Sequence, residues 1–246
     1  MPKKGRPMIE MRDLNRYYGD FPAVVGLSLS VGRGEIFTLL GPNGAGKTTT
    51  IKMLSGLLHP SRGRIRIGGY DLAQDSLRVR RILGYVPDFP FVYENLTPRE
   101  FLEFVGRIYR LPEDRLEENS LRLLELFGLT PYSSRLVRQL SHGFRQRLVF
   151  ASAFLHEPRV LLIDEPMVGL DPATGRLLKD ALLEFAAGGG TVFLSTHTLS
   201  LAEEISDRIG IMARGHLLLT GTPEQVKGGS SLEEAFLAGT GECRAP

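Results

Sequence analysis

The chain contains 246 residues, of which 42% are hydrophobic and 24% charged, and it carries a formal net charge of +2. Such a chain is long enough to bury a core of its own, and so small a net charge does not favour a nucleic-acid-binding surface. Its one cysteine, Cys243, excludes an internal disulfide, and no stretch approaches the roughly 20 apolar residues that span a bilayer. Residues 1–14 lack the apolar segment of a secretory signal, so we expect a cytoplasmic protein that acts at a membrane only through a partner.

Hydrophobic periodicity predicts alternating strands and helices. In chain order, the predicted elements are strands at 8–14, 24–31 and 34–40, a helix at 48–58, strands at 63–67 and 82–86, helices at 97–111, 112–129 and 143–158, a strand at 160–164, a helix at 173–187, a strand at 191–195, a helix at 200–206, and strands at 208–213 and 216–221. This order indicates an α/β protein with a parallel sheet, interrupted by a mostly helical insert.

The segment GPNGAGKTT follows a buried strand and opens a helix, which is the context that a phosphate-binding loop of the pattern G-x-x-x-x-G-K-[ST] requires. Its glycines let backbone N–H groups approach phosphate oxygens, and the helix N-terminus adds the positive end of its dipole. Lys47 brings a full charge to the β- and γ-phosphates, and the Thr48 hydroxyl can bind Mg²⁺. The predicted nucleotide-binding residues of this loop are Gly41, Pro42, Asn43, Gly44, Ala45, Gly46, Lys47, Thr48 and Thr49.

A second motif, VLLIDEP, places Asp164 and Glu165 at the end of a buried strand. Ligands of open α/β sheets bind at this edge, so we expect Asp164 to hold Mg²⁺, directly or through water, and Glu165 to polarise an attacking water. Two adjacent acids are also found at solvated strand ends, and the phosphate loop upstream is what favours the catalytic interpretation.

Three further motifs narrow the class of nucleotide-binding protein: LSHGFRQRL at 140–148, VGLDP at 168–172 and LSTH at 194–197. In this order, the motifs resemble those of the nucleotide-binding domain of ATP-binding cassette (ABC) transporters, and the likeness runs from about Met8 to Gly239. The resemblance implies an α/β fold of the P-loop NTPase class, with a RecA-like parallel-sheet core, a small antiparallel β-layer and a helical insert. It implies one domain over 1–246, with a catalytic core and β-layer at 8–87 and 159–228, a helical subdomain at about 88–158, and a C-terminal helix and tail at 229–246.

The resemblance also implies roles for individual residues. Tyr18 matches the aromatic residue that stacks on adenine, with Tyr17 as the less favoured neighbour and packing on the β-layer as the structural alternative. His197 matches the switch histidine, which bonds the γ-phosphate and orients the catalytic pair. Asp171 matches the loop that contacts the partner subunit's site. Three other histidines match no position of the family's site, and we expect them to be ordinary structural residues: His59, His156 and His216.

Two positions depart from the family pattern. Asp88 stands where the family usually has a glutamine, and we expect it to contact Mg²⁺, because a bare carboxylate beside the γ-phosphate would be repelled. In the usual LSGGQ signature, the serine hydroxyl and the N–H of the second glycine bind the γ-phosphate. Ser141 and Gly143 retain these groups, whereas His142 replaces a glycine and Phe144 the glutamine.

Family ATP sites form between two subunits, so the resemblance implies a second copy of this chain or a similar ATPase, beneath a separate transmembrane permease subunit on the inner face of the cell membrane. The segments PDFPFVYENLT and SSLEEAFLAGTG are similar to those of ABC-2-type exporter ATPases. Phe89, Phe91 and Tyr93 are candidates for the groove that receives the permease, with plain core as the alternative.

Two other functions are weighed against ATP-driven export. A soluble ABC ATPase acting on ribosomes or DNA would usually join two cassettes or carry long coiled coils, and this chain shows neither. A regulatory cassette that does not hydrolyse ATP is disfavoured by the presence of both Glu165 and His197.

Overall fold

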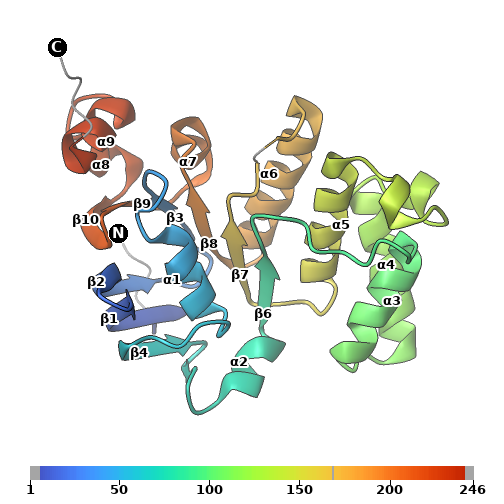
Figure 1. Ribbon diagram of the computed structural model, residues 1–246. Helices are drawn as coiled ribbons and strands as arrows, with labels where there is room; N and C mark the ends of the chain where they lie inside the picture. The colour runs from blue at the N-terminus through green and yellow to red at the C-terminus, as the bar shows by residue number, and fades with distance from the viewer. Residues whose placement is uncertain (1–5, 168, 242–246) are drawn as a thin grey trace.

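The computed structural model describes residues 6–167 and 169–241; Cys243 and Val168, the first residue of VGLDP, lie outside the described residues. Two sheets and the helices around them make up the described chain (Figure 1). The strands are β1 (Ile9–Tyr18), β2 (Phe21–Val31), β3 (Ile36–Leu40), β4 (Arg62–Ile67), β5 (Tyr70–Asp71), β6 (Leu83–Val86), β7 (Val160–Asp164), β8 (Thr191–Thr196), β9 (Arg208–Ala213) and β10 (His216–Gly221). The helices are α1 (Lys47–Leu54), α2 (Ser76–Arg81), α3 (Pro98–Ile108), α4 (Glu113–Leu126), α5 (His142–Phe154), α6 (Pro172–Ala187), α7 (Leu199–Ile205), α8 (Pro223–Lys227) and α9 (Leu232–Thr240), with short 3₁₀ helices at Thr130–Tyr132 and Val137–Gln139.

The larger sheet has the strand order β10-β9-β3-β8-β7-β6. Every neighbouring pair in it is parallel except β9 and β10, which form an antiparallel hairpin at one edge. All residues of β3, β7 and β8 are buried, which agrees with the apolar residues that predominate in β3 and β7 and form the centre of β8, because a parallel sheet is covered on both faces. The parallel sheet expected from the sequence is therefore confirmed.

The smaller sheet is antiparallel, with the order β2-β1-β4-β5. Its inner face contributes Ile9, Leu14 and Val24 to a core cluster that also contains Ile51 of α1. The β1 strand reaches Tyr18, four residues beyond the predicted end, because pairing with β2 resumes after irregularities in register. Asp13, in the left-handed region with φ 48°, lies at this irregularity and breaks the alternation on which the prediction rested.

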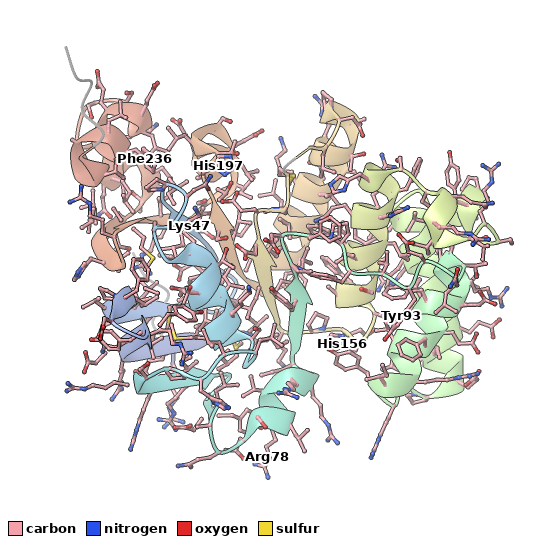
Figure 2. The ribbon with its side chains drawn as sticks, viewed as in Figure 1. Lys47, Arg78, Tyr93, His156, His197 and Phe236 are labelled. Atoms are coloured by element: carbon pink, nitrogen blue, oxygen red, sulfur yellow. The ribbon has the colours of Figure 1, made fainter. Side chains whose placement is uncertain are left out.

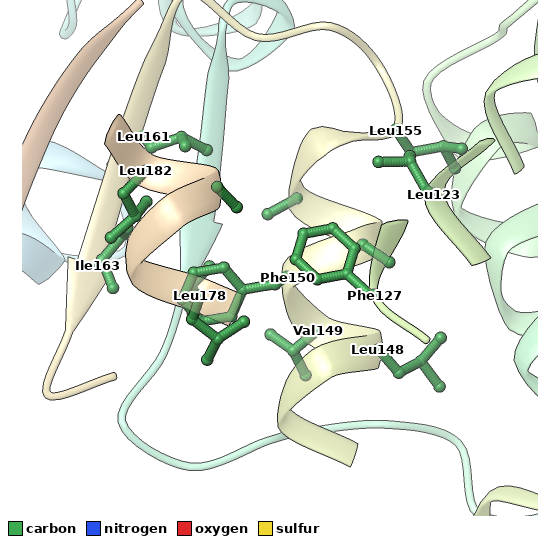
Figure 3. Close-up of a cluster of buried hydrophobic side chains, with 14 of the residues drawn as sticks. Leu123, Phe127, Leu148, Val149, Phe150, Leu155, Leu161, Ile163, Leu178 and Leu182 are labelled. Atoms are coloured by element: carbon green, nitrogen blue, oxygen red, sulfur yellow. The ribbon is translucent and has the colours of Figure 1, made fainter. Parts of the chain in front are cut away.

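The two faces of the larger sheet bury against different helices. On β7, Leu161 and Ile163 belong to a core cluster formed with α3, α4, α5 and α6, and Figure 3 shows their side chains beside Leu182 of α6, with Phe150 of α5 further to the right. Val160 and Leu162 belong instead to the cluster shared with α1 and the antiparallel sheet. The alternation along one strand therefore places α1 and α5 on opposite faces of the sheet.

Between β6 and β7 lie α3, α4 and α5, which pack on one another (Figure 1). A capping box fixes the start of α3: the Thr97 hydroxyl accepts from the Glu100 N–H, and the Glu100 carboxylate accepts from the Thr97 N–H. The short helices α2 and α8 were not predicted. Within the described residues, every helix lacks the combination of length and apolar character needed to cross a membrane.

Candidate functional site

The phosphate loop lies between β3 and α1 and is pressed against its neighbours. A Cβ at Gly41 would lie 2.3 Å from the Met212 carbonyl oxygen, and one at Gly46 would lie 2.4 Å from the Ala23 carbonyl oxygen. Gly46 also adopts φ 105°, so only glycine fits this position without strain. Gly46 caps α1 without a side-chain hydrogen bond, which leaves the first N–H groups of the helix available to a ligand.

Lys47 begins α1, and its side chain is almost completely buried (Figure 2). Its ammonium donates to the carbonyl oxygens of Gly41 and Pro42, at 2.7 and 3.1 Å, and lies 3.3 Å from Oε1 of Glu165. These acceptors neutralise and solvate a charge that would otherwise be costly to bury. The loop thus holds its own lysine against the acid at the end of β7.

Glu165 follows β7 in the left-handed region, with φ 46°, a conformation that strains a residue with a side chain. Its N–H donates to the Ser195 carbonyl at 3.0 Å, which fixes the backbone against β8. Its Oε2 accepts from Nδ1 of His197 at 2.9 Å and from the His197 N–H at 3.3 Å. A carboxylate only accepts, so Nδ1 carries the proton, and Nε2 is left for another partner. The structure therefore brings Lys47, Glu165 and His197 into one connected group.

Asp164, the last residue of β7, is fully buried. Its Oδ1 accepts a hydrogen bond from the Ser195 hydroxyl, whereas Oδ2 is buried without a hydrogen-bond partner. Burial raises the pKa of Asp164, the charges of Asp88 and Glu165 raise it further, and the hydroxyls of Ser195 and Thr48 offset part of the rise. A buried, unpaired carboxylate oxygen among other acids is an arrangement that a cation stabilises.

Asp88 is exposed, two residues after the end of β6, and its charge acts on both Asp164 and Tyr85. Burial, together with Asp164 and Asp88, raises the pKa of Tyr85 to about 12. Among the described residues, no three His, Cys, Asp or Glu side chains form a ready-made metal cluster. The chemistry of the donors fits Mg²⁺, which is commonly held by one or two carboxylates and a hydroxyl together with substrate phosphates. The candidate ligands are Thr48, Asp164 and Asp88.

Tyr18 ends β1 and is 48% exposed, so it is not buried in the β-layer. The Arg16 guanidinium lies 4.9 Å from the ring centroid and covers one face. Tyr17 is similarly exposed. An exposed aromatic ring with one face backed by a cation can stack a flat ligand on its other face.

Ser141 is the N-cap residue of α5, with φ −65° and ψ 164°, and its hydroxyl makes no capping bond. His142 and Gly143 form the first turn of the helix, so the residue at 142 needs no glycine conformation. Ser141 and His142 are exposed. Ser141 caps α5 and Lys47 begins α1, and these two helices cover opposite faces of the larger sheet.

Asp171 caps α6: its Oδ1 accepts from the Thr174 N–H at 2.9 Å, and its Oδ2 accepts from the Thr174 hydroxyl at 2.6 Å. These bonds lower the pKa of Asp171, and the charge of Arg147 lowers it further. Thr174 lies outside the motifs, and Arg147, although it lies within LSHGFRQRL, was given no role from the sequence. Ser195 lies within LSTH, and its place on the strand before His197 was the signal that could have identified it.

Comparisons with known proteins agree with this geometry. The ABC transporter family matches residues 24–168, more than half of the chain. The probable multidrug ABC transporter ATP-binding protein YbhF of Escherichia coli is 41% identical over 230 residues, which are 94% of this chain and 40% of YbhF, so the chain spans less than half of that relative. The linearmycin resistance ATP-binding protein LnrL of Bacillus subtilis is 33% identical over 96% of this chain and 77% of its own length.

A solved structure described as the ATP binding subunit of an ABC transporter superposes with a TM-score of 0.88 and 36% identity, covering 94% of this chain and 98% of the other. This likeness confirms the expected fold class, a P-loop ABC cassette with a parallel core, an antiparallel β-layer and a helical insert. The motifs, the fold and the relatives agree, and the chain belongs to the ABC transporter family, with the sequence and fold of that family's ATP-binding subunits.

Proposed function

We propose that the chain hydrolyses Mg-ATP as the ATPase subunit of an ABC transporter, and that it powers export through a separate membrane protein. The observation that carries the proposal is the convergence of Lys47, Glu165 and His197 at the edge of the parallel sheet where ligands bind. Support for export comes from two relatives, the linearmycin resistance ATP-binding protein LnrL and the Nod factor export ATP-binding protein I of Ralstonia nicotianae.

Phosphate binding would begin with an exchange of partners at Lys47. Its ammonium now bonds two loop carbonyls and Glu165, and the β- and γ-phosphate oxygens are stronger acceptors for the same charge. The backbone N–H groups of residues 43–48 and the start of α1 supply the remaining donors. Once Lys47 turns to phosphate, Oε1 of Glu165 is released to accept a hydrogen bond from water.

Glu165 is the proposed general base. Water attacks the γ-phosphorus while Glu165 takes its proton, and the bond from that phosphorus to the ADP oxygen breaks. His197 holds Oε2 of Glu165 in place through Nδ1–H, which aims Oε1 at the water. A phosphate oxygen only accepts, so contact from Nε2 of His197 to the γ-phosphate uses the doubly protonated ring.

Thr48, Asp164 and Asp88 are the residues proposed to hold Mg²⁺. Bound there, the ion would neutralise charge on the phosphates. The buried Oδ2 of Asp164 would then gain the partner that it lacks, and the repulsion between Asp164 and Asp88 would be balanced.

The ATP site is completed by a second chain in this proposal. Lys47 begins α1 and Ser141 caps α5, and these helices cover opposite faces of one sheet. In the family's ATP sites the phosphate loop of one subunit faces the signature of the other, and the same arrangement is proposed here. The free Ser141 hydroxyl and the Gly143 N–H at the start of α5 would bind the γ-phosphate held by the partner, while Tyr18 stacks on adenine. The partner is a second copy or a similar ATPase.

The exposed aromatic segment after β6 is the proposed contact with the permease. Phe89, Phe91 and Tyr93 are 58%, 75% and 58% exposed, which argues against a plain core role. Phe89 and Phe91 lie edge to face at 5.5 Å, and Tyr93 packs against Phe104 of α3 at 5.1 Å. Exposed aromatic groups of this kind mark contact surfaces. This partner places the chain in the cytoplasm, on the inner face of the cell membrane.

Steady-state ATP hydrolysis by the purified chain tests the proposal. Glu165→Gln keeps the size of the side chain but removes the base, so we expect turnover to fall by about 10²–10⁴-fold while ATP still binds. Glu125→Gln, on the exposed side of α4, is the matched control and should behave as the wild type. Turnover that survives Glu165→Gln excludes Glu165 as the base, and a wild type that binds ATP without turnover supports the regulatory alternative. Recovery of the chain on ribosomes rather than with an integral membrane protein overturns the transporter assignment.

A further inference from the structure

The start of α5 is tied to the start of α6 by a chain of hydrogen bonds that no motif predicts. Arg147 donates from Nε and Nη2 to the Thr174 hydroxyl oxygen, at 3.1 and 2.5 Å. That hydroxyl in turn donates to Oδ2 of Asp171 at 2.6 Å. An arginine has no acceptor, so the single proton of Thr174 is directed to Asp171, and the polarity of the whole chain is fixed. Both ends are charged, which strengthens each bond.

Phe144 provides the platform on which Arg147 rests. The guanidinium carbon of Arg147 lies 4.9 Å from the centroid of the Phe144 ring, and that ring packs against Tyr132 at 4.3 Å. A guanidinium over an aromatic face is attracted by the ring and keeps its plane free to donate. The phenylalanine at the position where the family usually has glutamine therefore has a specific contact in this chain.

Gly143 lies directly against the far end of the same hydrogen-bond chain. A Cβ at Gly143 would stand 3.6 Å from Oδ2 of Asp171 and 3.7 Å from the Thr174 hydroxyl oxygen. Thr174 is buried, with 1% of its surface exposed, so its hydroxyl has little access to water as a substitute partner. The helices themselves lie side by side, with Phe150 of α5 and Leu178 of α6 in one core cluster (Figure 3).

We propose that Arg147 and Thr174 are positioning residues that lock Asp171 to α5, so that the signature at the start of this helix and the loop leading from Glu165 move as one unit. The inference rests on the proposed ATPase function, and it adds the means by which one chain presents two groups together to the nucleotide of its partner. Neither residue touches ATP. Loss of the lock leaves nucleotide binding on the phosphate loop intact and lowers the rate of the closed dimer.

Substitution of Thr174 separates this positioning role from simple packing. Thr174→Val keeps the shape of the side chain but removes the hydroxyl. Because a hydrogen bond to charged groups is lost, we expect kcat to fall at least about tenfold. The KM for ATP should change less than about twofold. Thr174→Ser restores the hydroxyl and should return kcat to within about twofold of the wild type. Arg147→Lys keeps the charge but not the planar fork, so it should resemble Thr174→Val and serves as the second variant where the valine does not fold.

Equal loss in the valine and serine variants, or an unchanged kcat in Thr174→Val, overturns the inference. A fall in kcat matched by an equal rise in KM also overturns it, because the effect would then lie in ATP binding. A readout without turnover separates this inference from the proposed function. The carboxyl pKa of Asp171, followed by NMR, should rise in Thr174→Val and not in Thr174→Ser, whether or not the wild type hydrolyses ATP.

Discussion

His156 makes the stability of this protein depend on pH in a way that the structure quantifies. The residue follows α5, is 9% exposed, and stacks on Tyr109 with a centroid distance of 3.8 Å. Its Nε2 lies 3.1 Å from the Leu83 carbonyl oxygen, and its Nδ1 is buried without a partner. Burial lowers the pKa of His156 from 6.5 to about 4, and the Leu83 bond opposes the shift only in part.

The sign follows from linkage. The unfolded chain binds a proton at His156 near pH 6.5 and the folded chain only near pH 4, so stability is complete above pH 6.5 and is lost as the pH falls between these values. The loss amounts to about 2 kcal/mol at pH 5 and approaches about 3 kcal/mol below pH 4.

Urea unfolding of wild type and His156→Phe, at pH 7.5, 6.5, 5.5 and 5.0, measures this loss. Phenylalanine keeps a flat ring against Tyr109 but does not titrate, so carboxyl groups such as Asp164 contribute equally to both proteins and cancel in the difference. We expect the wild type to lose about 2 kcal/mol more than the variant between pH 7.5 and 5.0. Parallel pH profiles would refute the reasoning, because they would show that His156 titrates alike in the folded and unfolded chains.

Three further predictions test the site and its links. Asp88→Gln removes a charge that repels Asp164, and in a phosphate-release assay we expect turnover within about fivefold of the wild type; complete loss would show that the carboxylate is required. Ser141→Ala should lower turnover by about tenfold or more in the same assay, whereas His142→Gly should leave it nearly unchanged, and the reverse order would contradict the roles assigned to the signature. Arg145 of α5 bonds Glu94, next to the aromatic segment, at 3.1 Å, so Glu94→Arg should uncouple turnover from the membrane partner. The double variant Glu94→Arg with Arg145→Glu should restore the coupling, and its failure to do so would show that the pair does not act by charge.

The strands of the parallel core could be predicted from their apolar residues because these strands are buried on both faces. IFTLL, VLLID and TVFLST contain adjacent apolar residues, and each is a strand in the structure. The short helices α2 and α8 were missed, since six and five residues present too few apolar positions for a helical period. Asp13 shows a different limit: a single left-handed residue interrupts the alternation of β1 while the strand continues to Tyr18.

The candidate site was predictable where local sequence carries its geometry. Gly41 and Gly46 could be identified because close approach of backbone excludes any Cβ, and this requirement gives the loop its recurrent spacing. The turn that supports the loop was not predictable. Gly215 donates to the Ala45 carbonyl at 3.0 Å and accepts from the Val25 N–H at 2.9 Å, joining β9–β10 to both the loop and the antiparallel sheet. Such contacts depend on tertiary packing and leave no pattern along the chain.

Strain at Glu165 connects these observations with catalysis. A left-handed conformation in a residue with a side chain costs about 1–3 kcal/mol, and here it is maintained by the Ser195 carbonyl, by Lys47 and by His197. In the proposed mechanism, phosphate would take Lys47 from the Glu165 carboxylate, while the Glu165 N–H would keep its bond to the Ser195 carbonyl and Oε2 its bonds to His197. The proposed base would thus become more available to water without becoming more mobile. Oε2 of Glu165 accepts from both Nδ1 and the backbone N–H of His197. Loss of the His197 side chain should therefore disorder the proposed base once ATP is bound.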